Sequence, residues 1–462
     1  MAPAGRAVVI GASMGGLLAA RALSETYAEV VLLDRDVLPD GPANRRGVPQ
    51  GRQLHVLLDR GRQVLTALFP GLDEELTARG VCPVDLHGEV HWYNDGHRMR
   101  RAPSDLVAYG MSRPLLEQVV RERVHALPGV RVLSGHEVTG LIVTPDRRWV
   151  TGVRVSAGVR VPVGDRGSAG GRSEFTVAAD LVVDAGGRGS RSPVWLAAAG
   201  YRPAPEERVE VDVTYVTRTY RRESGQLEGL LGALANAVPG RPRAGIVAPQ
   251  EDGRFAVVLS GVLGEQPPTD DEGMAAFAET LPAPQIGELL RTARPVDPPA
   301  RMRFPASVRR RYERLRRLPE GHLVFGDGLC SFNPIYGQGM TVAALEALLL
   351  RRLLAEGGDG LARRFYRGAA RLIDPPWQLS VGTDLRFPEV TGRRTLRVRL
   401  VNAYVGRLHA AATTDAGLGA AFLRVLNLVD PPTRLLTPGR LVRVLRGPRR
   451  AVARRPVGVG RV

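Results

Sequence analysis

Residues 321–327 read Gly-His-Leu-Val-Phe-Gly-Asp, and residues 332–340 read Phe-Asn-Pro-Ile-Tyr-Gly-Gln-Gly-Met. The apolar run from His322 to Phe325 predicts a buried strand that a glycine ends. Asp327 follows at the carboxyl end of this strand, where open α/β sheets present side chains to a ligand. The second segment is a glycine-containing loop that leads into an apolar helix, predicted from Met340 to Leu354. Together they predict a strand–loop–helix unit that faces a ligand.

The chemistry of this unit suits a planar ligand that carries partial negative charge. The first amides of a helix have no partner inside it and carry the positive end of its dipole. Gly337 and Gly339 allow a flat ring to approach the backbone closely. A flavin fits, because its ribityl hydroxyls can bond Asp327 and its N1–C2=O edge gains negative charge on reduction. A structural turn whose glycines serve geometry alone explains the same residues, and short motifs often match by chance.

The amino terminus supplies a second glycine-rich turn. An apolar run, Ala7 to Ile10, precedes Gly11-Ala12-Ser13-Met14-Gly15-Gly16, and a predicted helix from Leu17 to Leu23 follows. A second strand, Glu29 to Leu33, ends at Asp34, an acidic residue about twenty positions past the first glycine. This βαβ pattern predicts a helix amino terminus that holds a pyrophosphate and an aspartate that bonds a ribose. Ser13 stands where the usual pattern has its middle glycine, and a purely structural turn is the alternative.

Only one complete fingerprint of this kind is present. Gly186 to Ser190 also follows an apolar strand, Leu181 to Val183, but no acid-ended βαβ unit comes after it. One fingerprint together with the distant Gly326-Asp327 element indicates a single dinucleotide that runs from the first site to the second. FAD suits that span better than NAD.

These elements together resemble the group A flavoprotein monooxygenases, which have the p-hydroxybenzoate hydroxylase fold. The similarity covers most of residues 1–355 and extends to Arg45–Gln50 and Ser112–Leu116. Within the family the chain looks most like the epoxidases that act on polyene precursors of polyether antibiotics. The resemblance implies that Arg113 contacts the pyrophosphate or ribose. The expected FAD contacts are Gly11, Ser13, Met14, Gly15, Gly16, Asp34, Arg35, Arg46, Gln50, Arg113, Asp184, Gly186, Asp327, Pro334, Gly337, Gln338, Gly339 and Met340.

The resemblance also implies an architecture, an α/β (α+β overall) chain with three parts. Residues 1–83, 111–200 and 301–355 are expected to form a discontinuous, Rossmann-like FAD-binding domain. Residues 84–110 and 201–300 are expected to form an interleaved antiparallel sheet that binds substrate, and residues 356–462 a C-terminal helical region.

The implied activity is insertion of one oxygen atom from O2 into a lipophilic alkene of a polyketide or terpenoid natural product, by way of a C4a-hydroperoxyflavin. The flavin carries this chemistry, so no catalytic side chain is assigned. NADPH or NADH would visit as a transient reductant, or a partner reductase would supply reduced flavin. Aromatic hydroxylation, reduction of isoprenoid double bonds and simple binding without turnover remain alternatives.

Some members of this fold are disfavoured by missing residues. None of the four tryptophans lies in the Tyr-x-Trp-x-Phe-Pro motif of geranylgeranyl reductases. Flavin-dependent halogenases use a lysine to carry hypohalous acid, and all 64 basic residues of this chain are arginines. The lack of lysine also excludes a Walker phosphate loop and a lysine Schiff base.

Composition bears on nucleic-acid binding, on disulfide and metal sites, and on location in the cell. The formal net charge of +17 would suit nucleic acid, but the arginines are dispersed and aromatic residues make up only 5% of the chain, so no nucleic-acid partner is expected. Two cysteines, Cys82 and Cys330, predict neither a disulfide framework nor a metal site. The absence of a signal peptide and of a long apolar run predicts a cytoplasmic protein without a membrane span. The oligomeric state is open.

Periodicity predicts several further elements. Residues 51–70 have helical spacing of leucines, and residues 207–221 alternate as a half-buried strand. Ala244–Ala248 and Phe255–Leu259 are expected to be neighbouring strands, and Gly164 to Gly171 a hairpin tip. Pro375-Pro376 is expected to break a helix, residues 395–428 to form one or two amphipathic helices, and the basic stretch Arg440 to Arg455 to be either a solvated end or a peripheral membrane contact.

Overall fold

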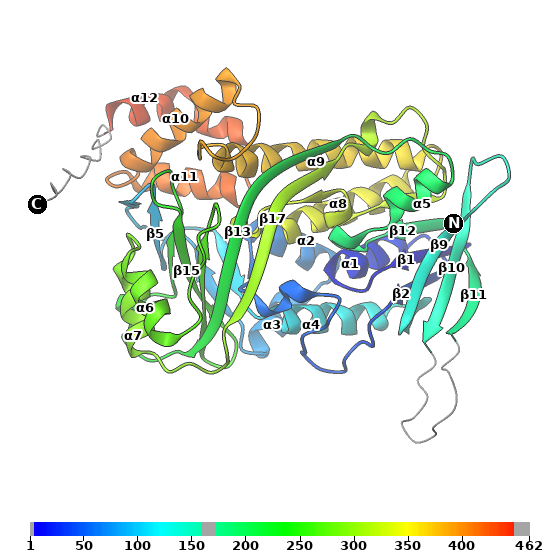
Figure 1. Cartoon of the computed structure of the whole chain (residues 1–462), viewed down its shortest axis with the longest axis horizontal. Helices are drawn as coiled ribbons and strands as arrows, with labels where there is room; N and C mark the ends of the chain where they lie inside the picture. The colour runs from blue at the N-terminus through cyan, green and yellow to red at the C-terminus, as the bar shows by residue number, and fades with distance from the viewer. Residues whose placement is uncertain (1–3, 159–171, 448–462) are drawn as a thin grey trace, which may run out of the picture.

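The strands predicted beside the two glycine-rich segments belong to a five-stranded parallel sheet in the order β18-β12-β1-β2-β8. The computed structural model describes residues 4–158 and 172–447 of the chain (Figure 1). The strands of this sheet are β1 (Arg6–Ile10), β2 (Glu29–Asp34), β8 (Val130–Ser134), β12 (Leu181–Asp184) and β18 (His322–Val324). Four of them, β1, β2, β12 and β18, are largely buried, as expected where both faces of a sheet are covered, and the edge strand β8 is partly exposed. The strands expected near residues 7–10, 29–33 and 322–325 are thereby confirmed.

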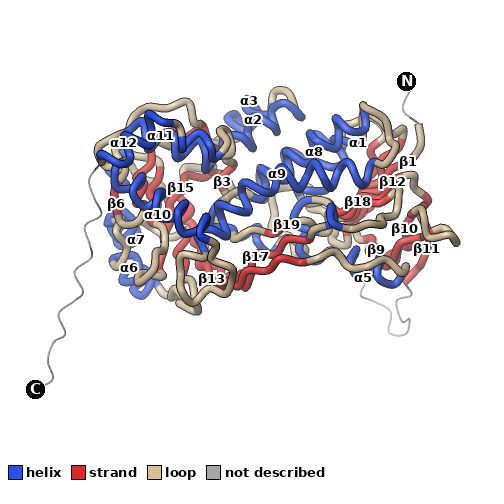
Figure 2. The backbone as a smooth tube through the Cα atoms, turned by 90° about the horizontal axis from the view of Figure 1, so that it is seen from above, coloured by secondary structure: helices blue, strands red, loops and turns tan. Residues whose placement is uncertain are grey.

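Helices cover one face of the parallel sheet and a small sheet covers the other. Figure 2 shows α1 and α8 on one side of β1, β12 and β18, and β9 to β11 on the opposite side. The helices on this side are α1 (Met14–Leu23), α4 (Arg113–His125) and α8 (Gly339–Ala355). α2 (Asp59–Leu68) packs on α8, α3 (Leu72–Ala78) packs on α2, and α5 (Ser192–Ala198) follows β12. The small antiparallel sheet consists of β9 (His136–Val143), β10 (Val150–Gly158) and β11 (Arg172–Ala178). The hairpin tip expected over Gly164 to Gly171 lies outside the described residues.

A second, eight-stranded sheet forms the other half of the molecule, in the order β19-β17-β13-β16-β15-β14-β5-β6. Its strands are β5 (Val90–Asn94), β6 (His97–Arg98), β13 (Glu206–Arg221), β14 (Gly232–Ala235), β15 (Arg243–Gln250), β16 (Arg254–Gly261), β17 (Ala300–Arg310) and β19 (Cys330–Ser331). The alternating strand expected at 207–221 and the expected 244–248 and 255–259 pair are confirmed. Two helices, α6 (Asp271–Glu279) and α7 (Pro284–Thr292), pack their apolar sides on one face of this sheet.

The junction between the halves combines segments from distant parts of the chain. β17 lies within residues that were expected to join the parallel-sheet domain, yet it pairs with β13 of the eight-stranded sheet. That sheet is antiparallel except for the parallel pair β5 and β14. A third small sheet, β3 (Val56–Leu57), β7 (Val107–Gly110) and β4 (Cys82–Asp85), lies nearby. The helix expected over residues 51–70 is wrong in its first part, because Val56 and Leu57 pair with β7 and α2 begins only at Asp59. Sheet pairing outweighed the helical spacing of the leucines.

The C-terminal residues are helical, as expected for that region. The helices are α9 (Leu361–Asp384), α10 (Leu396–Ala411), α11 (Ala416–Leu426) and α12 (Pro438–Arg446). Leu408, Leu418 and Leu423 pack in one apolar cluster with Trp92 and Leu106, so α10 and α11 rest on the 84–110 segment. Of the one or two amphipathic helices expected over residues 395–428, the structure has two helices, α10 and α11, and α10 leaves Leu396, Leu400 and Val401 exposed. Of the basic stretch from Arg440 onward, the part to Arg446 belongs to α12, and residues 448–462 lie outside the described residues.

The break expected at Pro375-Pro376 is wrong, since α9 runs continuously through both prolines. Tertiary contacts hold the helix just before them. Arg309, itself buried, donates to the carbonyl of Ala370 over 3.2 Å and forms an ion pair of 2.7 Å with Asp374. Such contacts outweigh the local cost of the prolines. No helix in the described ranges combines the length and apolar character that a membrane crossing needs.

Candidate functional site

A cavity of about 1550 Å³ lies between the two halves of the molecule, and both glycine-rich segments line it. Gly11 and Asp327, which are separated by more than three hundred residues, therefore face one continuous space. Two of the expected contacts, Gly16 and Arg46, are not among the lining residues. The expected contacts that do line it are Gly11, Ser13, Met14, Gly15, Asp34, Arg35, Gln50, Arg113, Asp184, Gly186, Asp327, Pro334, Gly337, Gln338, Gly339 and Met340.

The turn at Gly11 brings the amino terminus of α1 to the cavity. Gly11 has φ +96°, a left-handed backbone conformation that favours glycine. A Cβ at Gly16 would lie 1.7 Å from the carbonyl oxygen of Gly11, so Gly16 allows helix and strand to pack, as its position in the motif predicts. Ser13, the N-cap residue, makes no side-chain cap, and the first amides of α1 are left for a ligand.

A buried ionic network supports this end of the cavity. Glu117 on α4 accepts hydrogen bonds from Ser13 Oγ (2.8 Å) and Arg45 Nε (2.9 Å). Arg113 donates to Ser13 Oγ over 2.9 Å. Burial favours a higher pKa for Glu117, but the charges of Arg113 and Arg45 outweigh it, and the pKa is lowered. The network therefore places two guanidinium groups beside the start of α1.

Arg45, rather than the expected Arg46, belongs to this network. Arg46 is exposed, whereas Arg45 is buried and its Nη1 lies 3.2 Å from Oδ2 of Asp34. The same Asp34 oxygen accepts the amide of Ala12 over 2.7 Å, so Asp34 joins the end of β2 to the glycine turn. Sequence reasoning missed Arg45 because nothing in the local sequence distinguishes two adjacent arginines. Only the path of the folded backbone determines which of the two side chains points inward.

Asp184 holds the third segment of the site, the loop after β12. Its Oδ1 accepts the amide of Gly186 (2.8 Å), and its Oδ2 accepts the hydroxyls of Ser190 (2.7 Å) and Ser192 (2.5 Å). The carboxylate of Asp184 is thus occupied by its own loop. Its observed contacts position Gly186 at the cavity wall.

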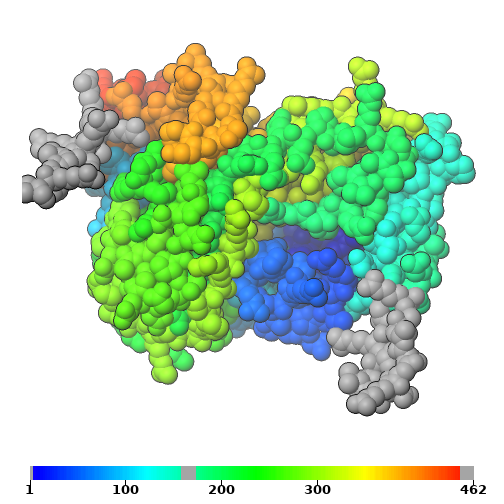
Figure 3. All heavy atoms as spheres, in the orientation of Figure 1, coloured from blue at the N-terminus to red at the C-terminus, as the bar shows by residue number. Residues whose placement is uncertain are grey.

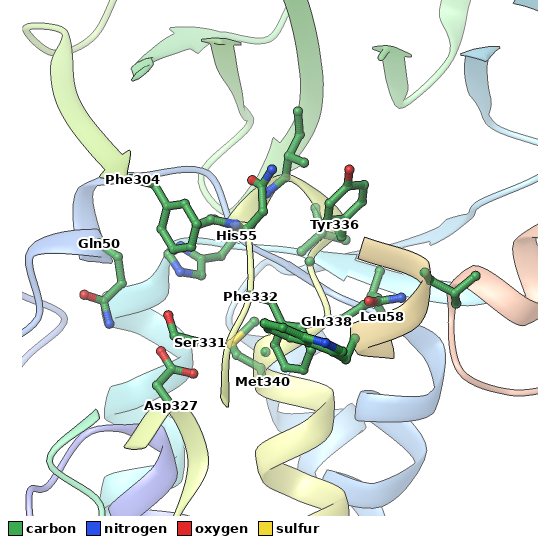
Figure 4. A pocket seen from close by; sticks show the side chains of 18 of the residues that line it. Gln50, His55, Leu58, Phe304, Asp327, Ser331, Phe332, Tyr336, Gln338 and Met340 are labelled. Carbon is green, nitrogen blue, oxygen red and sulfur yellow. The ribbon is translucent and has the colours of Figure 1, made fainter. Parts of the chain in front are cut away.

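The opposite end of the site is formed by Asp327 and the start of α8. Figure 4 shows Asp327, Gln50, His55 and Met340 around one hollow, with Phe304 and Phe332 beside them. Within the described chain no hydrogen-bond donor is paired with the Asp327 carboxylate, and its pKa is raised by burial against the charges of Arg113 and Arg188. Gln338, the N-cap residue of α8, makes no side-chain cap there either. An acceptor side chain and free helix amides therefore face the same space.

His55 is a neutral group in this wall. Burial, followed by the charge of Arg113, lowers its pKa to about 4. Its Nδ1 lies 2.9 Å from the carbonyl oxygen of Gln53, which fixes the ring. The structure places His55 in the cavity lining.

A buried carboxyl group, Asp384 at the end of α9, lies behind the loop that precedes α8. Its Oδ1 accepts from Tyr336 Oη (2.8 Å) and Asn333 Nδ2 (3.2 Å), and its Oδ2 has no partner in the described structure. Burial raises the pKa of Asp384 to about 6. Sequence reasoning missed this residue, because nothing in the arginine-containing sequence of α9 marks its last aspartate as buried.

The remainder of the cavity is a mostly apolar chamber between the antiparallel sheet and the C-terminal helices. Polar groups interrupt it, among them a buried pair: His409 Nδ1 donates to Asp95 Oδ2 over 2.9 Å, and Arg386 also pairs with Asp95. The ring of His409 meets Phe422 edge-on, and its Nε2 has no partner among the described residues. The apolar lining includes Trp92, Leu231, Leu234, Val258, Met302, Tyr404, Val425 and Leu435. No group of three potential metal-ligating side chains occurs in residues 4–158 and 172–447.

Comparison with known proteins relates the chain to one curated protein and to a fold. It is 38% identical to protein Rv3254 of Mycobacterium tuberculosis over 443 residues, which cover 93% of this chain and 90% of the relative. No family model matches the chain.

Several solved structures share its architecture. The flavin-dependent brominase Bmp2 has a TM-score of 0.65 at 16% identity, covering 91% of this chain and 92% of the brominase. PqsL of Pseudomonas aeruginosa, described as a probable FAD-dependent monooxygenase, has a TM-score of 0.56 at 18% identity, covering 90% and 98%. The flavin-dependent halogenase CmlS has a TM-score of 0.61 at 16% identity, covering 93% and 77%. At these identities the likeness establishes the fold, that of FAD-binding flavoproteins.

Proposed function

The chain belongs to the same family as protein Rv3254 of Mycobacterium tuberculosis, and we propose that it is an FAD-dependent monooxygenase. It would insert one oxygen atom from O2 into an alkene of a lipophilic substrate. The observation that carries this proposal is the single cavity that connects the amino termini of α1 and α8. A dinucleotide with phosphates at one end and a flat ring at the other matches that arrangement.

The donors at the first end fit a pyrophosphate. The uncapped amides of α1 and the Arg113 guanidinium provide hydrogen bonds and positive charge. Asp34 stands where a ribose hydroxyl would be accepted, and Arg45 balances its charge. These residues would bind and orient the cofactor.

The groups at the second end fit a ribityl chain and an isoalloxazine. Asp327 offers a carboxylate free of protein donors to the ribityl hydroxyls, and the uncapped start of α8 offers amides to the N1–C2=O edge. When bound, FAD supplies the chemistry: it takes up electrons and uses them to activate O2. Neutral His55 would add no charge to this end.

The chamber supports a lipophilic substrate. Apolar side chains from the antiparallel sheet and from α10 and α11 surround it, and they would exclude water from the reacting atoms. Epoxidation requires no protein nucleophile, which favours it as the primary reaction. Halogenation is not proposed, because the lysine that flavin-dependent halogenases use is missing.

Hydroxylation of a phenolic ring is the second candidate, because the structure offers proton acceptors. Asp384 has an unpartnered Oδ2, and His409 has an unpartnered Nε2 while Asp95 holds its Nδ1. Either group is suited to accept a phenolic proton within the cavity. Neither would be needed for an isolated alkene.

The test begins with the visible spectrum of the purified protein, which is expected to show bound flavin. Turnover with NADPH, NADH or a chemically reduced flavin, under labelled O2, is then measured with farnesol and geranylgeraniol as probe alkenes and 1-naphthol as probe phenol. Labelled oxygen is expected in an epoxide. Label in a hydroxylated naphthol supports the second candidate. Product formed without O2 supports a reductase, and label derived from water contradicts oxygen transfer from O2.

A further inference from the structure

The mouth of the chamber carries an exposed apolar surface. Leu400 and Val401 on α10 and Leu436 after α11 line the cavity while remaining 62%, 44% and 51% exposed. Leu396, which is 72% exposed, lies one helical turn before Leu400 and so on the same side of α10. We call these four residues the mouth patch. Figure 3 shows the layer to which α10 belongs, in orange, standing above the antiparallel half of the molecule.

The patch is held together by the packing of the C-terminal helices. Tyr404, one turn after Leu400, donates its hydroxyl to the carbonyl of Leu435 over 2.5 Å, which places Leu436 beside α10. Two further exposed apolar residues, Val442 and Leu445, lie on α12, which packs against α10. The other exposed large apolar side chains come from separate segments of the described chain: Val37, Trp149, Phe175, Val194 and Val296. Scattered exposed apolar side chains need no partner.

Unpaired positive charge surrounds the mouth patch. Residues 391–447 contain ten arginines and two aspartates. Arg393 and Arg397 line the cavity mouth, and Arg399 and Arg434 are exposed next to patch residues in the chain. Within the described ranges none of these four arginines forms an ion pair with a carboxylate, unlike Arg424 and Arg443 nearby.

We propose that the mouth patch docks on an anionic phospholipid membrane and receives the lipophilic substrate directly from it. Apolar side chains between arginines match the acyl boundary and the headgroups of such a surface. A second copy of the chain fits less well, since a symmetric contact would bring the same unpaired arginines opposite one another. The inference rests on the proposed function only for the nature of the cargo, because docking itself requires no flavin.

The experiment is vesicle flotation of the full-length protein. Wild type is expected to float with phosphatidylcholine vesicles that contain one quarter phosphatidylglycerol, and about tenfold less with pure phosphatidylcholine. The double variant Leu400→Glu/Leu436→Glu is expected to lose at least about tenfold in binding to the anionic vesicles. The control Val194→Glu/Val296→Glu changes two apolar residues of similar exposure elsewhere and is expected to bind as wild type.

A second variant and a folding control complete the flotation experiment. Arg397→Gln/Arg399→Gln retains the apolar residues and is expected to weaken binding to anionic vesicles alone. Thermal unfolding verifies that each variant folds. The proposal is overturned if wild type does not float, if the mouth-patch variant floats like wild type, or if that variant only dissociates a solution dimer. The flavin spectrum is recorded on the same samples, so loss of docking with retained flavin defeats this inference and leaves the proposed function intact.

Discussion

The two ends of the cavity are built in different ways. At the α1 end, the backbone of a short glycine turn and the amino terminus of α1 form the wall, and the residue spacing that creates them is local. At the chamber end, side chains from the antiparallel sheet, α9, α10 and α11 meet across large sequence distances. The comparison shows that a site made by backbone geometry is visible in sequence, whereas a site assembled from distant side chains is not.

The largest expected effect tests the α1 end of the cavity, which is built from residues close together in the sequence. Gly16→Ala would place a Cβ 1.7 Å from the Gly11 carbonyl oxygen, so helix and strand must separate. We expect a loss of more than about 4 kcal/mol in the free energy of unfolding, together with loss of bound flavin. Gly15→Ala is the matched control, since its Cβ would have ordinary contacts at 3.8 Å and beyond. Equal behaviour of the two variants in thermal unfolding contradicts the assigned packing role.

The next effect separates two adjacent arginines. Arg45→Gln leaves Glu117 and Asp34 buried without their common partner, which is expected to cost about 3–5 kcal/mol of unfolding free energy. Arg46→Gln, at an exposed position outside the cavity lining, is expected to change it by less than about 0.5 kcal/mol. Urea unfolding of both variants measures the difference. If Arg46→Gln lowered the free energy of unfolding more than Arg45→Gln, the sequence-based assignment of Arg46 to the site would be favoured over Arg45.

A third effect is the pH dependence that Asp384 creates at the chamber end. Its pKa is raised from 3.8 to about 6, so the folded state binds the proton more tightly than the unfolded state. This contribution to stability is complete below pH 3.8 and is lost as pH rises to about 6. Asp384→Asn keeps a neutral side chain. Between pH 4 and pH 6.5 wild type is expected to lose about 2–3 kcal/mol more stability than the variant; parallel curves from urea unfolding contradict the raised pKa.

The smallest effect concerns cofactor affinity. Asp327→Asn removes the charge that would accept the ribityl hydroxyls, and we expect FAD to bind about 10–100-fold more weakly. Asp359→Asn, at an exposed position, serves as the control. Titration of apoprotein with FAD, followed by fluorescence quenching, measures both. Unchanged FAD affinity in Asp327→Asn would contradict the proposed bond between Asp327 and the ribityl hydroxyls.

Sequence alone predicted much of the half that contains the parallel sheet, and the reasons are local. Gly11, Gly16 and Asp34 have fixed spacing because one turn, one helix and one strand connect them. The same reasoning went wrong where long-range pairing competed with a local pattern. Val56 and Leu57 continue a helical spacing but pair with β7, and Pro375-Pro376 remain helical because Arg309 holds α9 beside them. The expected contacts themselves remain predictions, since their proximity to one cavity is not binding.

By itself the sequence determined a parallel sheet whose first strand leads into a glycine turn and whose last strand leads to Asp327. It also determined that a helix follows each of these two segments. These features depend on backbone geometry, which a few consecutive residues specify. Only the tertiary structure decided that Arg45 rather than Arg46 turns inward, that Asp384 and His409 reach the cavity, and that α10 brings apolar residues to its mouth. Those placements depend on how separate elements pack, and packing is a property of the whole chain.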